Sequence, residues 1–443
     1  MNTPIYDFVK EYAERKSVRL HMPGHKGKGP MGFEKYDITE FFGADSLFHP
    51  DGIIEESEDN LTSIFETGRS LYSCEGSSLC IRAMMYLAML YKGGGYIMAG
   101  RNAHASLITA SALLGFDIKW LYSEDDTGYI SCEITAQGLD KALSDSERPP
   151  FCVYITSPDY LGNICDIRAI SRVCEKHGVL LLVDNAHGSY LKFAKEDLHP
   201  ISLGAHMCCD SAHKTLPVLT GGAYLHISKA LPSFFIQNAK SALSTFASTS
   251  PSYLILSSLD KANQLLATDF RNELEALEKR CDLLRIRLVD KGYSLVGDEV
   301  IKITVDAKKY GYTGTDLASI LRKSDIVCEF YDEDYLVLML STQTDIKEID
   351  RLEEILLSVE KRVGLLPAHI TISPPKAVMS PRDAYLSQRE LVPIDQANGR
   401  ILAGANVFCP PAVSLIVAGE RFTPDIVNAC KRYGFTECFV VKE

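Results

Sequence analysis

Two short segments in the middle of the sequence place reactive side chains directly after apolar runs. In one, Asp184 and His187 follow Val179–Val183; in the other, Lys214 follows Gly204–Cys209 within the sequence DSAHKTLP. Parallel sheets bind ligands at the carboxyl ends of their strands, which is where such residues would lie. Taken singly, each segment is ambiguous, because the Asp can be a helix cap or loop residue and a lone loop lysine is usually a solvated charge.

Together, the two segments indicate pyridoxal phosphate (PLP) chemistry. An amine near an apolar floor and other cationic groups loses its proton more readily and becomes a nucleophile. Lys214 can therefore form the Schiff base with PLP. Asp184 can pair with the pyridine nitrogen and keep it protonated, so that the ring accepts electrons.

A phosphate site is predicted earlier in the chain. Gly76, Ser77 and Ser78 precede the apolar run Leu79–Leu90, which is typical of a helix. Backbone N–H groups at a helix N-terminus bind phosphate well, although an ordinary Gly/Ser helix start has the same appearance. His104 can stack on a cofactor ring, but a loop histidine is more often a surface or hydrogen-bonded residue.

The surrounding pattern predicts an α/β protein with a parallel sheet. Phe151–Thr156 and Val179–Val183 are apolar enough to be buried strands. Between them, Asp166 can cap a helix that ends at His177 and Gly178. Strand, helix and strand in about thirty residues form a βαβ unit. Further short strands are predicted at 204–209 and 223–227.

Beyond residue 260 the pattern changes to that of a second domain. Apolar residues recur at helical spacing over 260–291, which predicts one long amphipathic helix joining two domains. A smaller α/β domain follows, with strands at 300–305 and 335–340 and helices at 314–323 and 345–359. The proline-rich stretch 365–381 is typical of a linker, and a strand at 413–418 and a helix at 424–433 are predicted after it. The expected parts are an N-terminal arm (1–60), a PLP-binding large domain (61–259), a linking helix with the small domain (260–364), and a C-terminal domain (365–443).

Composition excludes several classes of protein. The 443 residues carry 46 basic and 58 acidic side chains, a net charge of −12, whereas a nucleic-acid binder needs a basic face. The N-terminal sequence has no apolar core of a signal peptide, and no run approaches about 18 apolar residues. The 13 cysteines include no CxxC pair and no zinc-like spacing, so we expect reduced thiols, no metal site and a cytoplasmic protein without membrane or nucleic-acid partners.

With these residues in hand, the sequence resembles the major-domain family of ornithine/lysine/arginine decarboxylases, PLP enzymes of fold type I. His21–Lys26 resembles the family's H-x-P-G-H-K arm, and further segments match in the same order along most of the chain. These segments are Tyr36–Glu40 with Asp45, Leu47, Pro50 and Gly52; Gly76–Ser78; Arg101–His104; Ser157–Gly162 with Asp166; Asp184–Gly188; Ser211–Leu216; Thr249–Tyr253 with Leu259 and Asp260; Gly399–Ile401; Pro410–Pro411; and Gly419–Glu420.

The resemblance implies an aspartate-aminotransferase-like large domain with a mostly parallel sheet and smaller C-terminal α/β domains. It also implies decarboxylation of a basic amino acid (lysine, arginine or ornithine) to the amine and CO₂. The residues implied for catalysis are Lys214, His104, Asp184 and His213. Those implied for cofactor binding are Gly76, Ser77, Ser78, His104, Asp184, Ala186, His187, Ser211, His213 and Lys214. Glu329 and Glu420 are candidates to face a cationic substrate, although each taken singly is better explained as an exposed loop acid.

The same resemblance implies a homodimer with the active site at the subunit interface. The arm and Thr249–Tyr253 are the expected contacts. Larger family members carry an N-terminal wing domain before the arm. Because the arm begins near residue 20 here, we expect neither the wing nor a ring built on it.

Several positions depart from the family pattern: Ala105, Asn185, Tyr190, Gly221–Gly222 and Pro410–Ala412. We expect Ala105, Asn185 and Gly221–Gly222 to reshape the substrate end of the pocket and to leave the cofactor end unchanged. Two alternatives stay open. Another fold-type-I reaction, such as transamination or elimination, uses the same cofactor residues, and a non-catalytic protein can retain the fold.

Overall fold

The computed structural model describes residues 1–123, 130–367, 373–404, 408–409 and 413–443. The chain forms two compact units. The first comprises Met1–Gly94 and Ile167–Leu274, and the second comprises Gly95–Asp166 and Glu275–Glu443.

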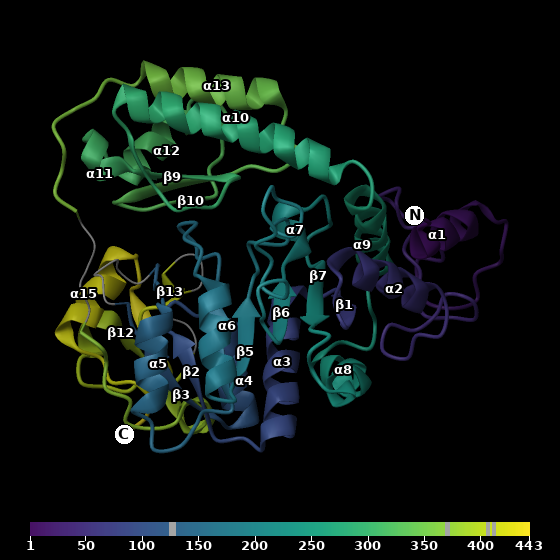
Figure 1. Cartoon of the computed structure of the whole chain (residues 1–443), viewed down its shortest axis with the longest axis horizontal. Coiled ribbons are helices and arrows are strands. Elements are labelled where there is room, and N and C mark those ends of the chain that lie inside the picture. Colours follow the sequence, from purple (N-terminus) through teal and green to yellow (C-terminus); the bar gives the residue numbers. More distant parts are fainter. Residues whose placement is uncertain (124–129, 368–372, 405–407, 410–412) are drawn as a thin grey trace. The chain divides into compact units, whose positions relative to one another are not determined.

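A mostly parallel sheet is the central element of the fold (Figure 1). Its seven strands follow the order β1-β7-β6-β5-β4-β2-β3. β2 pairs in parallel with β3 and β4, and β5 pairs in parallel with β6, whereas β7 is antiparallel to β1 and β6. The strands are β1 (Arg69–Ser73), β2 (Tyr96–Gly100), β3 (Asp117–Leu121), β4 (Cys152–Thr156), β5 (Leu180–Asp184), β6 (Met207–Asp210) and β7 (Ala223–Ile227). The predicted α/β class and the strands at 151–156, 179–183, 204–209 and 223–227 are confirmed, with shifted ends.

In the first unit, α3 (Gly76–Lys92) packs against α8 (Ser233–Phe246) and against β6 and β7. Leu79, Ala83, Met84 and Leu87 form part of its buried face. α6 (Ile167–Lys176) begins directly after Asp166, as predicted, and is followed by Gly178 in the left-handed region at φ +65°. These contacts hold α3 against α8 and the strands β6 and β7.

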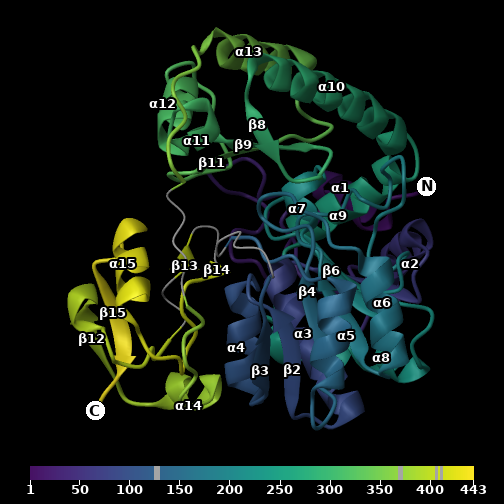
Figure 2. The same ribbon diagram turned by 60° about the vertical axis from the view of Figure 1, so that its left-hand side comes forward.

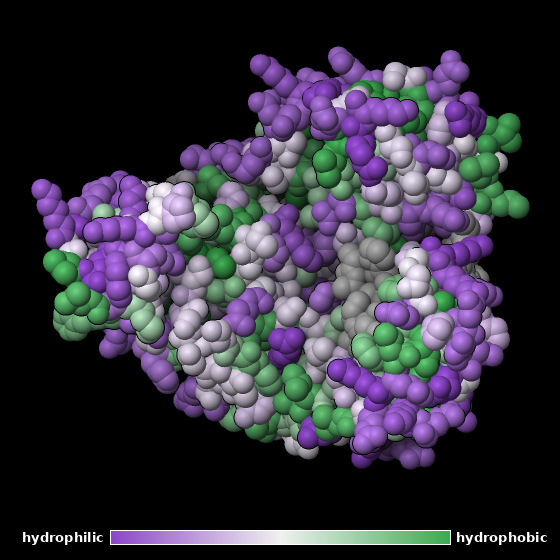
Figure 3. All heavy atoms as spheres, turned by 180° about the vertical axis from the view of Figure 1, so that it is seen from behind, coloured by the Kyte–Doolittle hydropathy of each residue, from purple (hydrophilic) through white to green (hydrophobic). Residues whose placement is uncertain are grey.

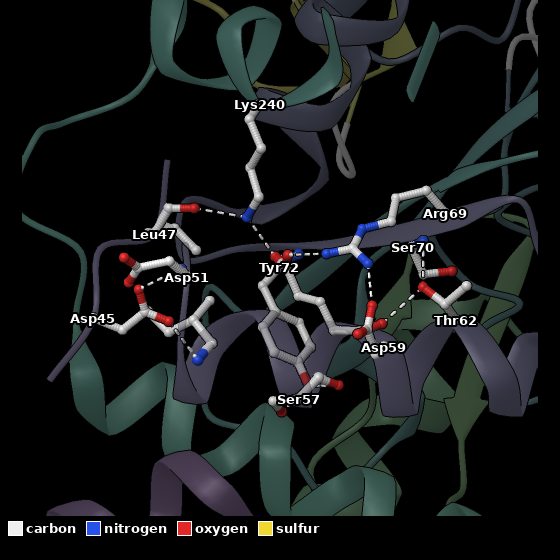
Figure 4. Close-up of polar contacts among 12 residues, drawn as sticks. Asp45, Leu47, Asp51, Ser57, Asp59, Thr62, Arg69, Ser70, Tyr72 and Lys240 are labelled. Atoms are coloured by element: carbon white, nitrogen blue, oxygen red, sulfur yellow. Dashed lines mark hydrogen bonds and ion pairs between the residues drawn. The ribbon is translucent and has the colours of Figure 1, made fainter. Parts of the chain in front are cut away.

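The arm before the sheet contains α1 (Pro4–Glu14) and α2 (Ile53–Phe65) and is anchored by charged residues (Figure 4). The Asp45 carboxylate accepts hydrogen bonds from the backbone N–H groups of Asp51, at 3.1 Å, and Ile54, at 2.8 Å, at the start of α2. Lys240 Nζ donates to the Leu47 carbonyl and to Glu58 Oε1, both at 2.6 Å. A buried carboxylate and ammonium are tolerated because each is paired.

The second unit contains a four-stranded antiparallel sheet in the order β10-β11-β9-β8. Its strands are β8 (Ser294–Val296), β9 (Lys302–Asp306), β10 (Phe330–Tyr331) and β11 (Tyr335–Met339), and its helices are α11 (Ala307–Tyr310), α12 (Gly314–Arg322) and α13 (Ile346–Ser358). α13 lies beside the C-terminal part of α10 (Phe270–Lys291), and Arg280 joins the two helices through Asp350 at 2.8 Å and Glu353 at 2.7 Å. The outer surface of this part is mostly hydrophilic (Figure 3).

The C-terminal part of the same unit packs α15 (Pro424–Arg432) against the two-stranded sheet of β12 (Arg389–Pro393) and β15 (Glu437–Val441) (Figure 2). The other elements of this part are α14 (Pro381–Leu386), the short helix Ile394–Gln396, β13 (Phe408–Cys409) and β14 (Val413–Ser414). The helices α4 (Ala105–Leu114) and α5 (Ala136–Ser144) belong to the Gly95–Asp166 segment of the same unit. The strand predicted at 413–418 ends at Ser414, because Glu420 Oε2 accepts the Val417 N–H and turns the chain. The departure at Pro410–Ala412 lies outside the described residues.

The single helix predicted over 260–291 is wrong. α9 (Tyr253–Leu266) ends at the cap Ala267, and α10 begins at Phe270. Thr268 Oγ1 donates to the Gln264 carbonyl at 2.9 Å, and the Asp269 carbonyl accepts the Glu273 N–H at 3.1 Å. Thr and Asp favour such local bonds and helix caps over helix interiors, so the helix ends here. The apolar periodicity of the sequence nevertheless continues from α9 into α10.

Among the described residues, no helix is both long and apolar enough to cross a membrane.

Candidate active site

Asp184 lies at the carboxyl end of β5, beside the end of β6. The two strands are parallel, and Asp184 stands opposite Cys209. Only 2% of Asp184 is exposed. Its Oδ1 accepts the Ala186 N–H at 3.2 Å and the Cys209 thiol at 3.6 Å. The carboxylate is therefore held in one direction at a strand end, as the sequence predicted.

Lys214 lies in the short helix α7 (Ala212–Thr215), which follows β6. Its Nζ is 3.1 Å from His187 Nε2, and His187 follows β5 in the same turn region as Asp184. Lys214 is exposed, whereas His187 is buried. The structure therefore brings together the two segments that the sequence singled out, and it gives His187 a direct contact with the lysine amine.

The predicted phosphate site lies at the start of α3, a 17-residue helix. The Ser211 hydroxyl donates to Ser77 Oγ at 2.8 Å, which joins this helix start to the Lys214 segment. Gly76 has φ +69°, and its N–H donates to the Gly221 carbonyl at 2.8 Å. Ser77 and Ser78 are half-buried in the first turn, where helix N–H groups are available to an anion.

His213 is fixed by Gly222, whose carbonyl accepts the His213 N–H at 3.1 Å and lies 2.9 Å from His213 Nδ1. Thr215 Oγ1 is buried and has no hydrogen-bond partner in the described part of the chain. No role for Thr215 was predicted from the sequence. The one sequence feature that could have identified it is its position next to Lys214. A hydroxyl buried in this way favours a polar ligand nearby.

Asn185 and Gly221–Gly222, which we expected at the substrate end, lie beside residues of the predicted cofactor site. Asn185 donates to Asp210 Oδ1 at 2.7 Å behind the Asp184 strand end, and Gly221 and Gly222 support Gly76 and His213. Gly221 has φ +98°, and an added Cβ there would lie 2.9 Å from the Cys74 carbonyl oxygen. These contacts support Gly76, His213 and the strand end that carries Asp184, and the effect of the departures on the substrate end stays a prediction.

His104 belongs to the second unit, where it caps α4. Its Nδ1 accepts the Ser106 N–H at 3.1 Å, and its backbone pairs with Val413 in an isolated antiparallel bridge. Arg101, three residues earlier, donates to the Ser414 carbonyl at 2.8 Å. The segment predicted to stack on the ring is thus tied to the C-terminal part of its own unit.

The two acidic candidates for substrate recognition differ. Glu420 is neither a free nor an exposed acid, because it is 2% exposed and its Oε2 is 3.3 Å from Arg101 Nη2. Burial raises its pKa against the opposing attraction of Arg101. Glu329 is exposed and accepts the Tyr160 hydroxyl at 2.8 Å, so only Glu329 presents a carboxylate to solvent.

One polar cluster was not found from the sequence. His199, Cys208 and Asp210 lie together in the first unit, all fully buried, with donor atoms that suit a metal ion. Asp210 Oδ2 is 3.3 Å from His199 Nε2 and 3.4 Å from His226 Nε2. No spacing rule finds this cluster, because its members come from a loop and from β6.

The fold and these residues define an α/β protein of the fold-type-I class of PLP enzymes. Family comparison is specific: residues 3–287 match the Orn/Lys/Arg decarboxylase major domain, and residues 366–433 match the Orn/Lys/Arg decarboxylase C-terminal domain. The chain belongs to the Orn/Lys/Arg decarboxylase family, whose members are PLP-dependent carboxy-lyases.

Relatives and solved structures agree with this assignment. An arginine decarboxylase of Bacillus subtilis (strain 168) is 30% identical over 464 residues, covering 96% of this chain and 92% of that protein. The lysine decarboxylase LdcF of Francisella novicida has a TM-score of 0.82 at 16% identity, covering 99% of this chain and 81% of that one. Lysine decarboxylase A of Pseudomonas aeruginosa has a TM-score of 0.81 at 18% identity, covering 99% and 80%. At these identities the two structures establish the fold.

Proposed function

We propose that this chain decarboxylates a basic amino acid at PLP attached to Lys214. The observation that carries the proposal is the placement of Lys214, His187 and Asp184 at two adjacent strand ends of one unit. Curated relatives at 28–30% identity bear the name arginine decarboxylase, which makes arginine the first substrate to assay. Lysine and ornithine follow.

The donor set fits PLP. The α3 N-terminus with Ser77 and Ser211 would hold the phosphate, Asp184 would face the pyridine nitrogen, and Lys214 would provide the amine. When bound, PLP supplies an electron sink for the electron pair left at the substrate Cα when CO₂ departs. Asp184 is suited to keep a proton on the ring nitrogen, because its carboxylate is already oriented by Ala186 and Cys209.

The remaining residues act on protons and position. His187 Nε2, 3.1 Å from Lys214 Nζ, can accept a proton from the lysine amine. His213 is held by Gly222 and can orient the helix turn that carries Lys214. Ala186, with its small side chain, would allow close approach to the ring, and the stacking role of His104 stays a prediction from the family resemblance.

The substrate side chain needs an acceptor for its positive charge. Glu329 is the exposed acid of the two candidates, and its carboxylate is oriented by Tyr160. We propose Glu329 as the residue that recognises the cationic end.

We further propose that the active form is a homodimer with the active site at the interface, and that the arm provides contacts to the second copy. The arm exposes large apolar residues, which stable proteins usually cover: Val18, Leu20, Met22, Met31, Phe33 and Phe42. Tyr253 donates to the Ala44 and Asp45 carbonyls, both at 2.8 Å, so Thr249–Tyr253 supports the arm of its own chain. Sedimentation at assay concentration should show a dimer, and Phe42→Glu should weaken it; an active monomer would contradict this.

The proposed activity is tested by incubating the purified protein with PLP and each of arginine, lysine, ornithine, glutamate and leucine. CO₂ and the matching amine are expected from at least one basic substrate. A keto acid as the product would show a different fold-type-I reaction. Turnover of neutral or acidic substrates alone would refute the cationic substrate. Lys214→Ala is the control, because borohydride should trap no adduct in this variant.

A further inference from the structure

Asp210, the last residue of β6, is a fully buried carboxylate that the proposed mechanism does not use. Its Oδ1 accepts the Asn185 Nδ2–H at 2.7 Å. Its Oδ2 lies 3.3 Å from His199 Nε2 and 3.4 Å from His226 Nε2. Burial raises the pKa of Asp210, but attraction to the two imidazoles and their hydrogen bonds outweighs burial and holds the pKa well below its usual value. The carboxylate is therefore ionised and faces the Asn185 amide and the nitrogens of the two imidazoles.

The imidazoles are themselves fixed. His226 Nδ1 is 2.7 Å from Ser70 Oγ, which is 2.6 Å from Thr67 Oγ1. The rings of His199 and His226 pack against Phe65 with centroid distances of 5.2 and 4.5 Å. A carboxylate bound to such partners has little freedom to move.

This network is connected to Asp184 through Asn185. Asp184 pairs with Cys209, and side chains alternate along a strand, so Asp184 and Asp210 face opposite sides of the sheet. Asn185 is fixed twice to β6: its N–H donates to the Cys209 carbonyl at 3.0 Å, and its side chain donates to Asp210. The residue next to Asp184 is therefore locked in both main chain and side chain.

We propose that Asp210 is a positioning residue that, through Asn185, aims the Asp184 carboxylate at the cofactor ring. The inference rests on the proposed binding of PLP at Asp184. Asn185 stands where the resembling family usually has Glu. This difference gains a physical role, because an amide donates to Asp210 whereas a carboxylate would repel it.

The same cluster has the donors of a metal site, since Cys208 Sγ lies 3.8 Å from His199 Nε2 beside Asp210 Oδ2. We favour the hydrogen-bond network because the Asp210 carboxylate accepts from Asn185 and faces His199 Nε2 and His226 Nε2 at 3.3 and 3.4 Å, and because Ser70 orients His226. Zinc content of the purified protein distinguishes the two. The hydrogen-bond interpretation would be overturned if the purified protein contained stoichiometric zinc and if removing that zinc with EDTA lowered the stability of the protein.

The test compares Asp210→Ala and Asp210→Asn with the wild type. The PLP dissociation constant, the visible absorption and circular dichroism of the bound cofactor, and urea unfolding of the apoprotein are measured. Asp210→Ala should weaken PLP binding at least about 10-fold, as outer-shell losses do at metal sites, and alter the visible spectrum. Asp210→Asn should stay within about threefold of wild type. Its Oδ1 still accepts from Asn185, and its two N–H hydrogens can donate to His199 and His226 once their tautomers reverse.

Asp260→Asn is the matched control, because Asp260 is equally buried in the same unit but caps α1 through the N–H groups of Ile5 and Tyr6. It should change stability and leave the cofactor spectrum unchanged. If Asp210→Ala does not fold, the same measurements are made on Asn185→Ala, which removes the hydrogen bond between Asn185 and Asp210 and keeps the Asp210 carboxylate. A wild-type spectrum and PLP affinity in Asp210→Ala or, failing that, Asn185→Ala would overturn the inference. Failure of the wild type to bind PLP would instead refute the proposed function.

Discussion

Glu420→Ala should destabilise the C-terminal part of the second unit far more than an ordinary surface substitution. Glu420 Oε2 accepts the Val417 N–H at 2.7 Å and lies 3.3 Å from Arg101 Nη2. Both charged side chains are nearly inaccessible, at 5% and 2% exposure. Removing the carboxylate takes away the negative charge that lies 3.3 Å from the buried Arg101 guanidinium.

Breaking a buried ion pair from one side costs about 3–5 kcal/mol. Arg101 would keep its bonds to the Ser414 and Leu415 carbonyls, at 2.8 and 3.3 Å, so we expect a loss near the lower end, about 3 kcal/mol. The pair itself stabilises little, because burial raises the pKa of Glu420 despite Arg101. Removing both charges together should therefore cost much less than removing one.

The chain provides its own probe, because its one tryptophan, Trp120, lies with its ring centroid 5.1 Å from Arg101 Cζ. Urea unfolding is followed by tryptophan fluorescence and by far-UV circular dichroism. Glu420→Gln keeps an acceptor for Val417 and should lose less than the Ala variant. The double variant Arg101→Met, Glu420→Leu should recover most of the stability. A loss below about 1 kcal/mol in Glu420→Ala, or a double variant no more stable than it, would refute the reasoning.

Other charged residues give three further expectations. Asp184→Ala should still form a borohydride-trapped adduct at Lys214 but lose at least about 100-fold in kcat; near-normal turnover would exclude the electron-sink role. Glu329→Gln should raise KM for the basic substrate about 10-fold with kcat kept, and an unchanged KM would place the recognition elsewhere. Burial raises the pKa of Asp260 from 3.8 to about 6. Its contribution to unfolding stability is thus fully present below about pH 4 and lost as pH rises through about 6, by up to about 3 kcal/mol. Urea midpoints across this range should show that loss in wild type and not in Asp260→Asn.

The features that could be predicted from the sequence are those that a short segment determines by itself. A carboxylate at a strand end and a lysine after the next strand are local patterns, and the structure places Asp184 and Lys214 on adjacent strand ends. The start of α3 at Gly76 follows from its residues in the same way. The roles of these residues and the domain boundaries stay predictions. The end of α9 and the start of α10 are also determined by local residues, Thr268 and Asp269. The apolar periodicity continues across these residues, and for that reason the sequence predicted one helix.

Pairings across long stretches of chain were not predictable, and they decide what the unusual residues do. Arg101 and Glu420 are 319 positions apart, and Asn185 and Asp210 are 25 apart on neighbouring strands. Neither partner identifies the other in the sequence, because a buried charge is recognisable only when its environment is known. For that reason Glu420 resembled a loop acid and Asn185 a substrate-side change. In the structure, Glu420 neutralises an arginine in the His104 segment and Asn185 joins Asp184 to a buried carboxylate. Three of the departures, Asn185, Gly221 and Gly222, thus contact or adjoin residues that we propose for the cofactor site, and their effect is on how those residues are held.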